Sequence, residues 1–438
     1  MKKHKHFALK RELGLWQTTL CGIGIILGAG IYALIGEAAG IAGNAVWISF
    51  IVAAIISAFT GLSYAELSSM FPKASAEYEY TRKSAGKTIG FLAGWMIIFA
   101  GIVGAATVSI GFGSYFNALF GTSGLIISIA AVLVMAVINF YGIKQSANVA
   151  IILTLIEAGG LIFIIFLGLP YIGSVDYFAM PAFHSMFDGM FSGVLAAAAL
   201  IFFAYIGFED MVRLSEETKK PTKNIPKALI IAIAITTIIY ILVALSAVSV
   251  LGWERLSTSQ APLADVASLA LGSNAFLALA IAALFSTFNT ALLMLIATSR
   301  IMYGMANDRA LPSVMGFVHR KRRTPWTAIL VTTILCVMFL FFENIKMAAS
   351  ITNFFVFLLF AVINFSVIRL RYKYPKAKRG FRVPLNIGKL PILPILGIIF
   401  SLLLMVSLSM TSILYGIAII ILGLVIYEFY KHTKKKKS

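Results

Sequence analysis

The sequence predicts an all-helical, polytopic membrane protein with twelve transmembrane helices. Three observations lead to this fold class: the composition of the chain, a series of long apolar runs, and the placing of basic residues between those runs. Of the 438 residues, 60% are hydrophobic and 12% are charged, and the mean hydropathy is +0.95. Soluble domains carry about 25% charged residues, so the composition excludes an ordinary soluble protein.

An apolar run of about 20 residues is long enough to cross a bilayer as a helix. The runs of this kind follow one another along almost the whole chain, separated by short polar segments. They span residues 14–36, 46–70, 88–117, 123–141, 148–169, 189–212, 227–250, 274–299, 325–342, 348–369, 391–410 and 412–430.

The lysines and arginines alternate with these runs. If the N-terminus lies inside the cell, 34 of the 36 basic residues fall in cytoplasmic segments, and only Arg255 and Lys346 lie outside. The positive-inside rule requires this asymmetry, which predicts cytoplasmic tails at 1–13 and 431–438. The net charge of +19 therefore indicates contact with anionic lipid headgroups. Nucleic-acid binding would need a basic face on a folded module, which the pattern does not contain.

The first run contains four glycines within nine residues, at Gly22, Gly24, Gly28 and Gly30. Glycine costs about 1 kcal/mol relative to alanine inside a helix. Broken helices at membrane depth are tolerated where the freed backbone groups line a cavity. The alternative is close helix packing through small residues, because Gly24 and Gly28 have the Gly-x-x-x-Gly spacing.

The sixth run contains a second unusual stretch, FFAYIGFED at residues 202–210, with aromatics, a glycine and two adjacent carboxylates. A carboxylate at membrane depth is expensive and indicates a functional site; the alternative is a helix that ends early, with Glu209 at the interface. The first and sixth runs occupy matching positions if runs one to five and six to ten are two repeats. Interrupted helices in matching halves are typical of the binding site of an inverted-repeat transporter.

Five segments in order resemble the amino acid–polyamine–organocation (APC) superfamily, over nearly the whole chain. They are GIILGAGIY (24–32), LSYAELSSMFPK (62–73), FAYIGFE (203–209) with the following cytoplasmic loop, RIMYGMAND (300–308) and FRVP (381–384). The resemblance implies a five-plus-five inverted repeat, the leucine-transporter-like fold, with broken first and sixth helices. The repeats would be 14–169 and 189–370, and the last two helices, 391–430, would lie outside them.

The resemblance also implies an amino acid substrate, or a related amine, held by the two helix breaks. The substrate carboxylate would bind N–H groups between Ile26 and Gly30, at the positive end of the second half-helix, and the ammonium would bind free carbonyls of both breaks. Aromatic rings of the second break would select the substrate side chain. The substrate-binding residues predicted in this way are Ile23, Gly24, Ile26, Gly28, Ala29, Gly30, Phe203, Ala204, Tyr205, Ile206, Gly207, Phe208 and Glu209.

Glu157 lies in the middle of the fifth run. Relatives of this fold bind sodium between helices one, five and eight, or place a lysine near this position when they couple to protons. The lysine is absent here, and a carboxylate that exchanges a proton could replace it. The alternative is a glutamic acid that is hydrogen-bonded for packing alone. H+ and Na+ both stay open as coupling ions.

Three polar residues of the eighth run, Ser286, Asn289 and Thr290, have i, i+3, i+4 spacing and share one helix face. They match the polar face that the family places opposite the first helix; the alternative is hydroxyl-to-backbone bonding within their own helix. Glu66, at the cytoplasmic end of the second run, is predicted to pair with a basic residue as a structural or gating contact.

The function predicted from these features is secondary active transport of amino acids or related amines across the cytoplasmic membrane by alternating access. A channel, a transporter-like nutrient sensor, or a polyamine or cationic-substrate exchanger of the same fold are the alternatives. Short tails disfavour a sensor. The sequence contains no nucleotide-binding Gly-Lys-Ser/Thr loop, nucleophile–base pair or metal-ligand cluster, so we expect no ATP drive, enzymatic activity, cofactor or metal.

Overall fold

The computed structural model describes residues 13–71, 76–141, 146–181, 190–216, 218–322, 324–342 and 344–435. In the first half of the chain the helices are α1 (Leu15–Ile26), α2 (Gly30–Ala42), the 3₁₀ turn η1 (Gly43–Ala45), α3 (Val46–Met70), α4 (Ala76–Ala85), α5 (Lys87–Phe120), α6 (Gly124–Tyr141), α7 (Ser146–Gly168) and η2 (Leu169–Tyr171).

The second half of the chain is also mainly helical. They are α8 (Met190–Ile201), η3 (Phe202–Tyr205), η4 (Phe208–Glu216), α9 (Pro221–Thr258), α10 (Pro262–Leu271), α11 (Ser273–Asn307), η5 (Ser313–Gly316), α12 (Trp326–Leu340), α13 (Ile345–Lys373), α14 (Ile392–Val406) and α15 (Met410–Lys435). A hairpin of two short strands, β1 (Asn386–Ile387) and β2 (Leu390–Pro391), interrupts the otherwise helical order.

The structure confirms an all-helical membrane protein. Within the described residues, nine helical segments are long and apolar enough to cross a bilayer, and shorter apolar helices accompany them: α1, α10, α12 and α14. The predicted first run, 14–36, is divided between α1 and α2. Helix α4, helix α10 and the hairpin fall between the predicted runs, because a ten-residue helix or a short hairpin produces no span-length hydropathy signal.

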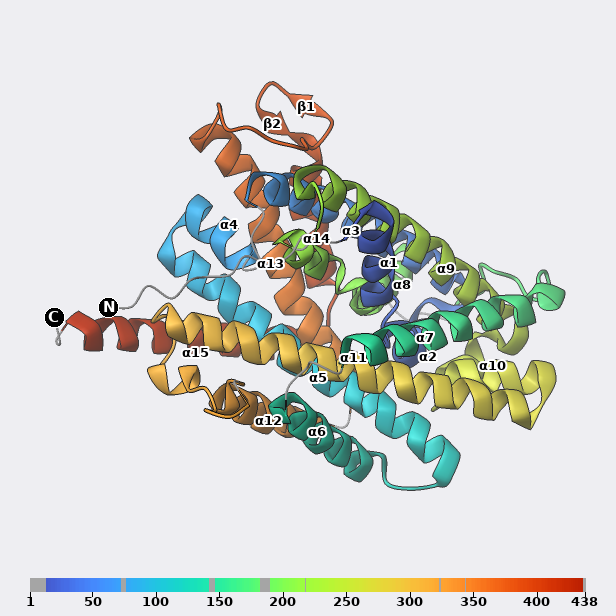
Figure 1. The fold of residues 1–438 in the computed structure, drawn as a ribbon. Coiled ribbons are helices and arrows are strands. Elements are labelled where there is room, and N and C mark those ends of the chain that lie inside the picture. Colours follow the sequence, from blue (N-terminus) through green and yellow to red (C-terminus); the bar gives the residue numbers. More distant parts are fainter. Residues whose placement is uncertain are drawn as a thin grey trace.

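The helices pack in more than one layer and form a bundle (Figure 1). Helix α5 packs against α11 and α13, while α9 packs against α1, α2 and α3. Small residues allow close approach at these contacts. A Cβ added at Gly61 of α3 would lie 2.8 Å from side-chain atoms of Leu229 and of Ile233 on α9. A larger residue at Gly61 would therefore separate the two helices.

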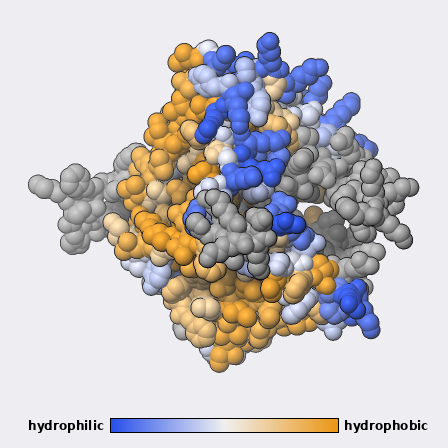
Figure 2. Space-filling view, turned by 90° about the vertical axis from the view of Figure 1, so that its left-hand side faces the viewer, coloured by the Kyte–Doolittle hydropathy of each residue, from blue (hydrophilic) through white to orange (hydrophobic). Residues whose placement is uncertain are grey.

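Apolar side chains cover the outward faces of the peripheral helices. On α6 the exposed residues include Ile126, Leu133 and Val137, and on α15 they include Leu414 and Val425. Figure 2 shows hydrophobic side chains over the lower part of the visible face, at the height where Figure 1 places α6 and α12. In a protein of this composition such a surface is the lipid-facing one, because a water-exposed monomer rarely carries large apolar patches.

Candidate functional site

The first helix break places a helix N-terminus inside the molecule. Helix α1 ends at Ile26 and α2 begins at Gly30, with residues 27–29 as a non-helical link. The first N–H groups of a helix have no partner within it, and they carry the positive end of its dipole. The Ala29 N–H donates to the Thr290 hydroxyl of α11 over 3.2 Å. The break therefore presents hydrogen-bond donors to the interior, and α11 already holds one of them.

The second break follows α8. Helix α8 ends at Ile201, the 3₁₀ turn η3 takes the chain to Tyr205, and Gly207 has φ +120°, which glycine adopts without the strain of a side chain. The Gly207 N–H donates to Oε2 of Glu209 over 2.9 Å. The 3₁₀ helix η4 begins at Phe208. The carbonyls at the end of α8 are thus released from regular α-helical bonding.

The two breaks lie directly against each other. A Cβ added at Gly30 would lie 2.6 Å from the Cα of Ala204, and one added at Gly207 would lie 3.0 Å from the Ile25 carbonyl oxygen. The Tyr240 hydroxyl of α9 lies 2.7 Å from the Ile26 carbonyl oxygen and 2.9 Å from that of Ala204. With one proton, this hydroxyl donates to either carbonyl in turn. Tyr240 thereby joins the end of α1 to the end of η3.

A second polar side chain supports the end of α8. The Asn353 Nδ2 group of α13 donates to the carbonyl oxygens of Ala199 and Leu200 over 2.7 and 2.9 Å. Asn353 is fully buried. Because a buried carbonyl without a partner costs free energy, this amide compensates for the helical bonds that the break removes.

A cavity of about 320 Å³ opens between the breaks and helices α5, α11 and α13. Most of the predicted substrate-binding residues line it. Those that do are Gly24, Ile26, Gly28, Ala29, Gly30, Phe203, Ala204, Ile206, Gly207 and Glu209, together with Asn289 and Thr290 of α11. Apolar groups from the other helices complete the wall: Ile97, Ala100, Leu293, Met294, Val356 and Leu359.

Ile23, Tyr205 and Phe208 are not among the residues that line this cavity. The Tyr205 hydroxyl donates to the Phe50 carbonyl over 3.0 Å. The Phe208 ring packs edge-on against that of Tyr64, with 6.0 Å between centroids. In a 3₁₀ turn residues three apart share a face, so Tyr205 follows Phe202 into the protein interior while Phe203 faces the cavity. The aromatic group predicted from sequence is therefore divided between cavity and packing.

Glu157, on α7, is buried against α2 and α11 and is not among the residues that line the cavity. Its side chain is 1% exposed, and its Oε1 accepts a hydrogen bond from the Ser286 hydroxyl over 2.5 Å. The Tyr32 hydroxyl of α2 donates to the Glu157 backbone carbonyl over 2.8 Å. The structure thus brings together Glu157 and Ser286, whereas Thr290, one turn along α11, contacts the first break instead.

Three carboxylate side chains lie at the part of the cavity that is next to α4 and η4. Glu77, Glu209 and Asp210 line this part, and the described residues that line the cavity include no lysine or arginine. Glu77 was not predicted as a site residue because it belongs to a helix, α4, that the hydropathy pattern missed.

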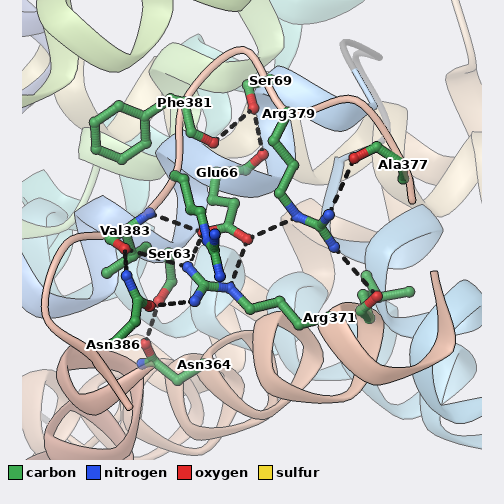
Figure 3. A network of polar contacts seen from close by, with 12 residues as sticks. Ser63, Glu66, Ser69, Asn364, Arg371, Ala377, Arg379, Phe381, Val383 and Asn386 are labelled. Carbon is green, nitrogen blue, oxygen red and sulfur yellow. Dashed lines mark hydrogen bonds and ion pairs between the residues drawn. The ribbon is translucent and has the colours of Figure 1, made fainter. Parts of the chain in front are cut away.

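The contact predicted for Glu66 is confirmed (Figure 3). Glu66 Oε1 accepts hydrogen bonds from Nε of Arg371, over 2.9 Å, and from Nε of Arg379, over 3.1 Å. Its Oε2 accepts from Arg371 Nη2 over 2.5 Å and from the Val383 N–H over 2.8 Å. Four donors occupy the four acceptor positions of the carboxylate. Glu66 therefore ties the end of α3 to the end of α13 and to the segment that follows it.

Comparison with known proteins identifies the family of this chain. The model of the family described as "Amino acid permease" matches residues 13–428. The chain belongs to this amino acid permease family of the APC superfamily. This permease is a multi-pass membrane transporter, not an enzyme, and the family implies the leucine-transporter-like fold.

Relatives that match the permease over nearly its whole length are named for different substrates. It is 32% identical to the branched-chain amino acid permease BcaP of Bacillus subtilis, over 98% of this chain and 95% of the relative. It is 30% identical to the methylthioribose transporter of the same species, over 99% and 96%. It is 27% identical to the B. subtilis glutamate/serine transporter AimA, over 98% and 83%. The family is therefore common to relatives whose named substrates differ.

Tyr240 and Asn353 are the contacts that the sequence reasoning missed. Each is a polar residue within a predicted apolar run, and a buried tyrosine hydroxyl or asparagine amide needs a hydrogen-bond partner. The sequence therefore indicates that each side chain needs a hydrogen-bond partner. It does not indicate which partner, because both side chains bond backbone carbonyls of helices that are distant in the sequence.

Proposed function

We propose that this permease is a secondary transporter that moves amino acids across the cytoplasmic membrane by alternating access. One observation carries the proposal: two helix breaks pack against each other and together line a cavity of about 320 Å³, and Tyr240 joins them. Such breaks supply unpaired backbone donors and acceptors at membrane depth, which is how transporters of this kind bind small polar substrates.

The proposal includes twelve membrane-spanning helices in a five-plus-five inverted repeat, with both termini in the cytoplasm. Residues 14–169 and 189–370 would form the repeats, and 391–430 the two remaining spans. The matching positions of the breaks, after α1 and after α8, support this arrangement. So does the alternation of basic residues along the sequence.

The two charged ends of an amino acid have separate partners in this proposal. The carboxylate would bind N–H groups at the start of α2, near Gly28 and Gly30, where the helix dipole is positive. The ammonium would bind carbonyls of the two breaks. Tyr240 contacts the Ile26 and Ala204 carbonyls. The other candidate acceptors are the carbonyls of Gly24, Ile25 and Phe203, and that of Phe203 also accepts from the Ile206 N–H over 3.3 Å.

The apolar wall of the cavity supports substrates with aliphatic side chains. Phe203, Val356 and Leu359 are nearly fully buried and line the cavity together with Met294. A substrate side chain that displaces water from such a wall gains about 25 cal/mol per Å² of apolar surface. The branched-chain substrate named for BcaP agrees with this class.

Counterflow tests the proposed function. Purified protein in liposomes preloaded with unlabelled leucine should accumulate external labelled leucine above its equilibrium level, because exchange through a carrier is driven by the unlabelled gradient. Empty liposomes and the Gly28→Val variant are the controls. Labelled leucine that only equilibrates, without a transient overshoot, would indicate a channel and would contradict the proposal.

Glu77, Glu209 and Asp210 favour a second candidate, a cationic amino acid or polyamine. Their carboxylates would attract a second positive charge on the substrate. A thermal-shift screen with leucine, lysine and spermidine discriminates the two candidates, because a ligand at 100 times its Kd stabilises the protein by about 2.7 kcal/mol. Stabilisation by lysine or spermidine and not by leucine would select the cationic class.

Phe203→Ala is expected to change selectivity. The variant removes the ring from the apolar wall and enlarges the cavity, while the backbone contacts remain. The preference between leucine and phenylalanine should therefore shift toward phenylalanine by about tenfold. Competition of unlabelled amino acids against labelled leucine measures the ratio. Tyr205→Phe is the matched control, because it removes only the hydroxyl that bonds Phe50. Equal weakening of every substrate in Phe203→Ala would mean that the ring is structural.

Glu157→Gln is expected to uncouple transport from the proton gradient. Glutamine keeps the shape and hydrogen-bonding of the side chain but cannot exchange a proton, and a coupling ion can bias only the state that binds it better. Leucine exchange should persist, while uptake should become independent of external pH. Liposome uptake at several pH values measures this.

Ser286→Ala controls for the Glu157 variant, because it removes the 2.5 Å hydrogen bond and keeps the carboxyl group. It should retain a response to pH. Proton-driven accumulation by Glu157→Gln would exclude Glu157 as the coupling group. A wild-type protein that requires sodium and ignores pH would instead indicate a cation site beside Glu157 and Ser286.

A further inference from the structure

The Glu66 cluster contains an excess of positive charge. The side chains of Arg371 and Glu66 are 3% and 1% exposed, and Arg379 is 10% exposed. Two guanidinium groups therefore share one carboxylate, whose four acceptor positions are already occupied. Removing charge from water is costly unless it is compensated. Counted over the residues that the structure describes, the cluster keeps a net formal charge of +1 after this pairing, although both guanidinium groups also donate to neighbouring oxygens.

A cavity of about 260 Å³ lies next to this cluster. The described residues that line it are Arg371, Pro375, Ala377, Arg379, Arg382 and Lys389, of which four are basic and none is acidic. Within the same part of the chain, the Arg382 guanidinium makes one long contact, 3.5 Å to the Gly388 carbonyl. Among the described residues, Lys389 has no hydrogen-bond or ion-pair partner for its ammonium group. The cavity therefore presents free donors and a net positive charge, which match an anion.

Two apolar side chains are exposed beside the cavity. Leu385, directly before β1, is 63% exposed, and Ile387 of β1 is 70% exposed. Leu385 has φ +57°, a conformation that is uncommon for a bulky residue and that persists only when its surroundings impose it. The hairpin leads directly into the apolar helix α14 at Ile392. Two exposed apolar side chains thus lie within a few residues of the start of α14, which the proposed topology places at the membrane boundary.

The views of the molecule agree with this placing. Figure 1 shows the hairpin at the upper edge, beyond the end of α13, and Figure 2 shows hydrophilic side chains at the same height with hydrophobic ones next to them. Basic groups beside exposed apolar side chains are the composition that binds an anionic membrane surface.

We propose that this cavity is a binding site for the phosphate headgroup of an anionic phospholipid. Arg382 and Lys389 bind the phosphate oxygens, and the buried Arg371 and Arg379 add the field of the cluster's net charge. Leu385 and Ile387 contact the glycerol and acyl region. A soluble phosphate would use the same basic groups, but it would leave these two apolar side chains in water. The bound lipid would fasten the hairpin and the end of α13 to the inner leaflet.

The test compares lipid-dependent thermal stability of detergent-purified, full-length protein. Phosphatidylglycerol added to the micelles should raise the Tm, and phosphatidylcholine should not. In the double variant Arg382→Gln/Lys389→Gln the concentration of phosphatidylglycerol needed for half of the shift should rise roughly 100-fold, since each of the two side chains loses a direct hydrogen bond to a charged phosphate. Neither residue lines the substrate cavity, so leucine counterflow should persist in the variant.

The matched control is Arg320→Gln/Lys321→Gln, which removes the same charge from two exposed residues of another polar segment. It should respond to phosphatidylglycerol as the wild type does. Equal losses in both double variants would mean that the attraction is only a general effect of surface charge, which would overturn the proposal. A Tm shift of equal size with inorganic phosphate or glycerol phosphate would overturn the assignment to a lipid.

Discussion

Glu66→Ala is expected to destabilise the permease by about 3–5 kcal/mol, the cost of breaking a buried ion pair by removing one partner. The variant leaves Arg371 and Arg379 without the carboxylate that each contacts through Nε. It also leaves the Val383 N–H without its acceptor. The expected result is a large fall in Tm and loss of the close contact between α3, α13 and the segment after α13.

Thermal unfolding in one detergent measures the effect, with Ser69→Ala as the matched control. Ser69 lies one turn from Glu66 on α3, and its hydroxyl donates to the Glu66 and Phe381 carbonyls. Its loss should cost about 1 kcal/mol, as a typical hydrogen bond does. Adding Arg379→Met to Glu66→Ala should restore part of the stability by removing one uncompensated charge. A Glu66→Ala variant as stable as Ser69→Ala would show that the cluster does not hold these helices.

The membrane-spanning helices could be predicted because the bilayer imposes length, apolarity and sidedness on them. Features that depend on other constraints were missed. Helix α10 begins at Pro262 and ends before Gly272, and these are legible helix signals, but ten residues fall below the length of a span. The β1–β2 hairpin is built of backbone pairing between Asn386 and Pro391, for which a two-residue strand contains almost no pattern.

The helix breaks were predictable for a different reason. Glycines at 24, 28 and 30 and the stretch 202–210 disfavour a continuous helix. Such residues are unexpected in a membrane helix that must satisfy its own backbone hydrogen bonds. Which side chains face the cavity could not be predicted. The sequence predicted Phe203, Tyr205 and Phe208 as one aromatic group. The 3₁₀ turn η3 and the φ of +120° at Gly207 replace the regular α-helical period there, so the directions of the three side chains could not be read from that period.

The partners of the freed carbonyls depend on tertiary packing alone. Tyr240 lies on α9 and reaches the ends of α1 and η3, more than 200 positions and 36 positions away in sequence respectively. A tyrosine in an apolar run predicts a hydrogen bond but not its acceptor. The sequence therefore predicts where the backbone of the proposed site leaves the helical conformation. The side chains that bond the freed carbonyls depend on the fold and could not be predicted.

Gly28→Val is expected to abolish substrate binding while the protein stays folded. A Cβ at Gly28 would lie 3.2 Å from the Thr290 hydroxyl oxygen and 3.3 Å from its methyl carbon. The larger valine would occupy the cavity in front of the α2 N–H groups and would disturb the bond from the Ala29 N–H to Thr290. Overpacking costs about 1–3 kcal/mol, and each lost hydrogen bond to a charged group costs about 1.5–3 kcal/mol.

The overpacking lowers the Tm, whereas the loss of two hydrogen bonds to the substrate carboxylate corresponds to a loss of binding of at least about 100-fold. Leucine-dependent thermal stabilisation and counterflow measure that loss, and the Tm without ligand reports folding. Gly159→Val is the matched control, because Gly159 lies on α7 with no atom near an added Cβ, so it should bind leucine as the wild type does. A folded Gly28→Val protein with normal leucine binding would place the substrate elsewhere, since no amino acid carboxylate could reach the start of α2 past the valine side chain.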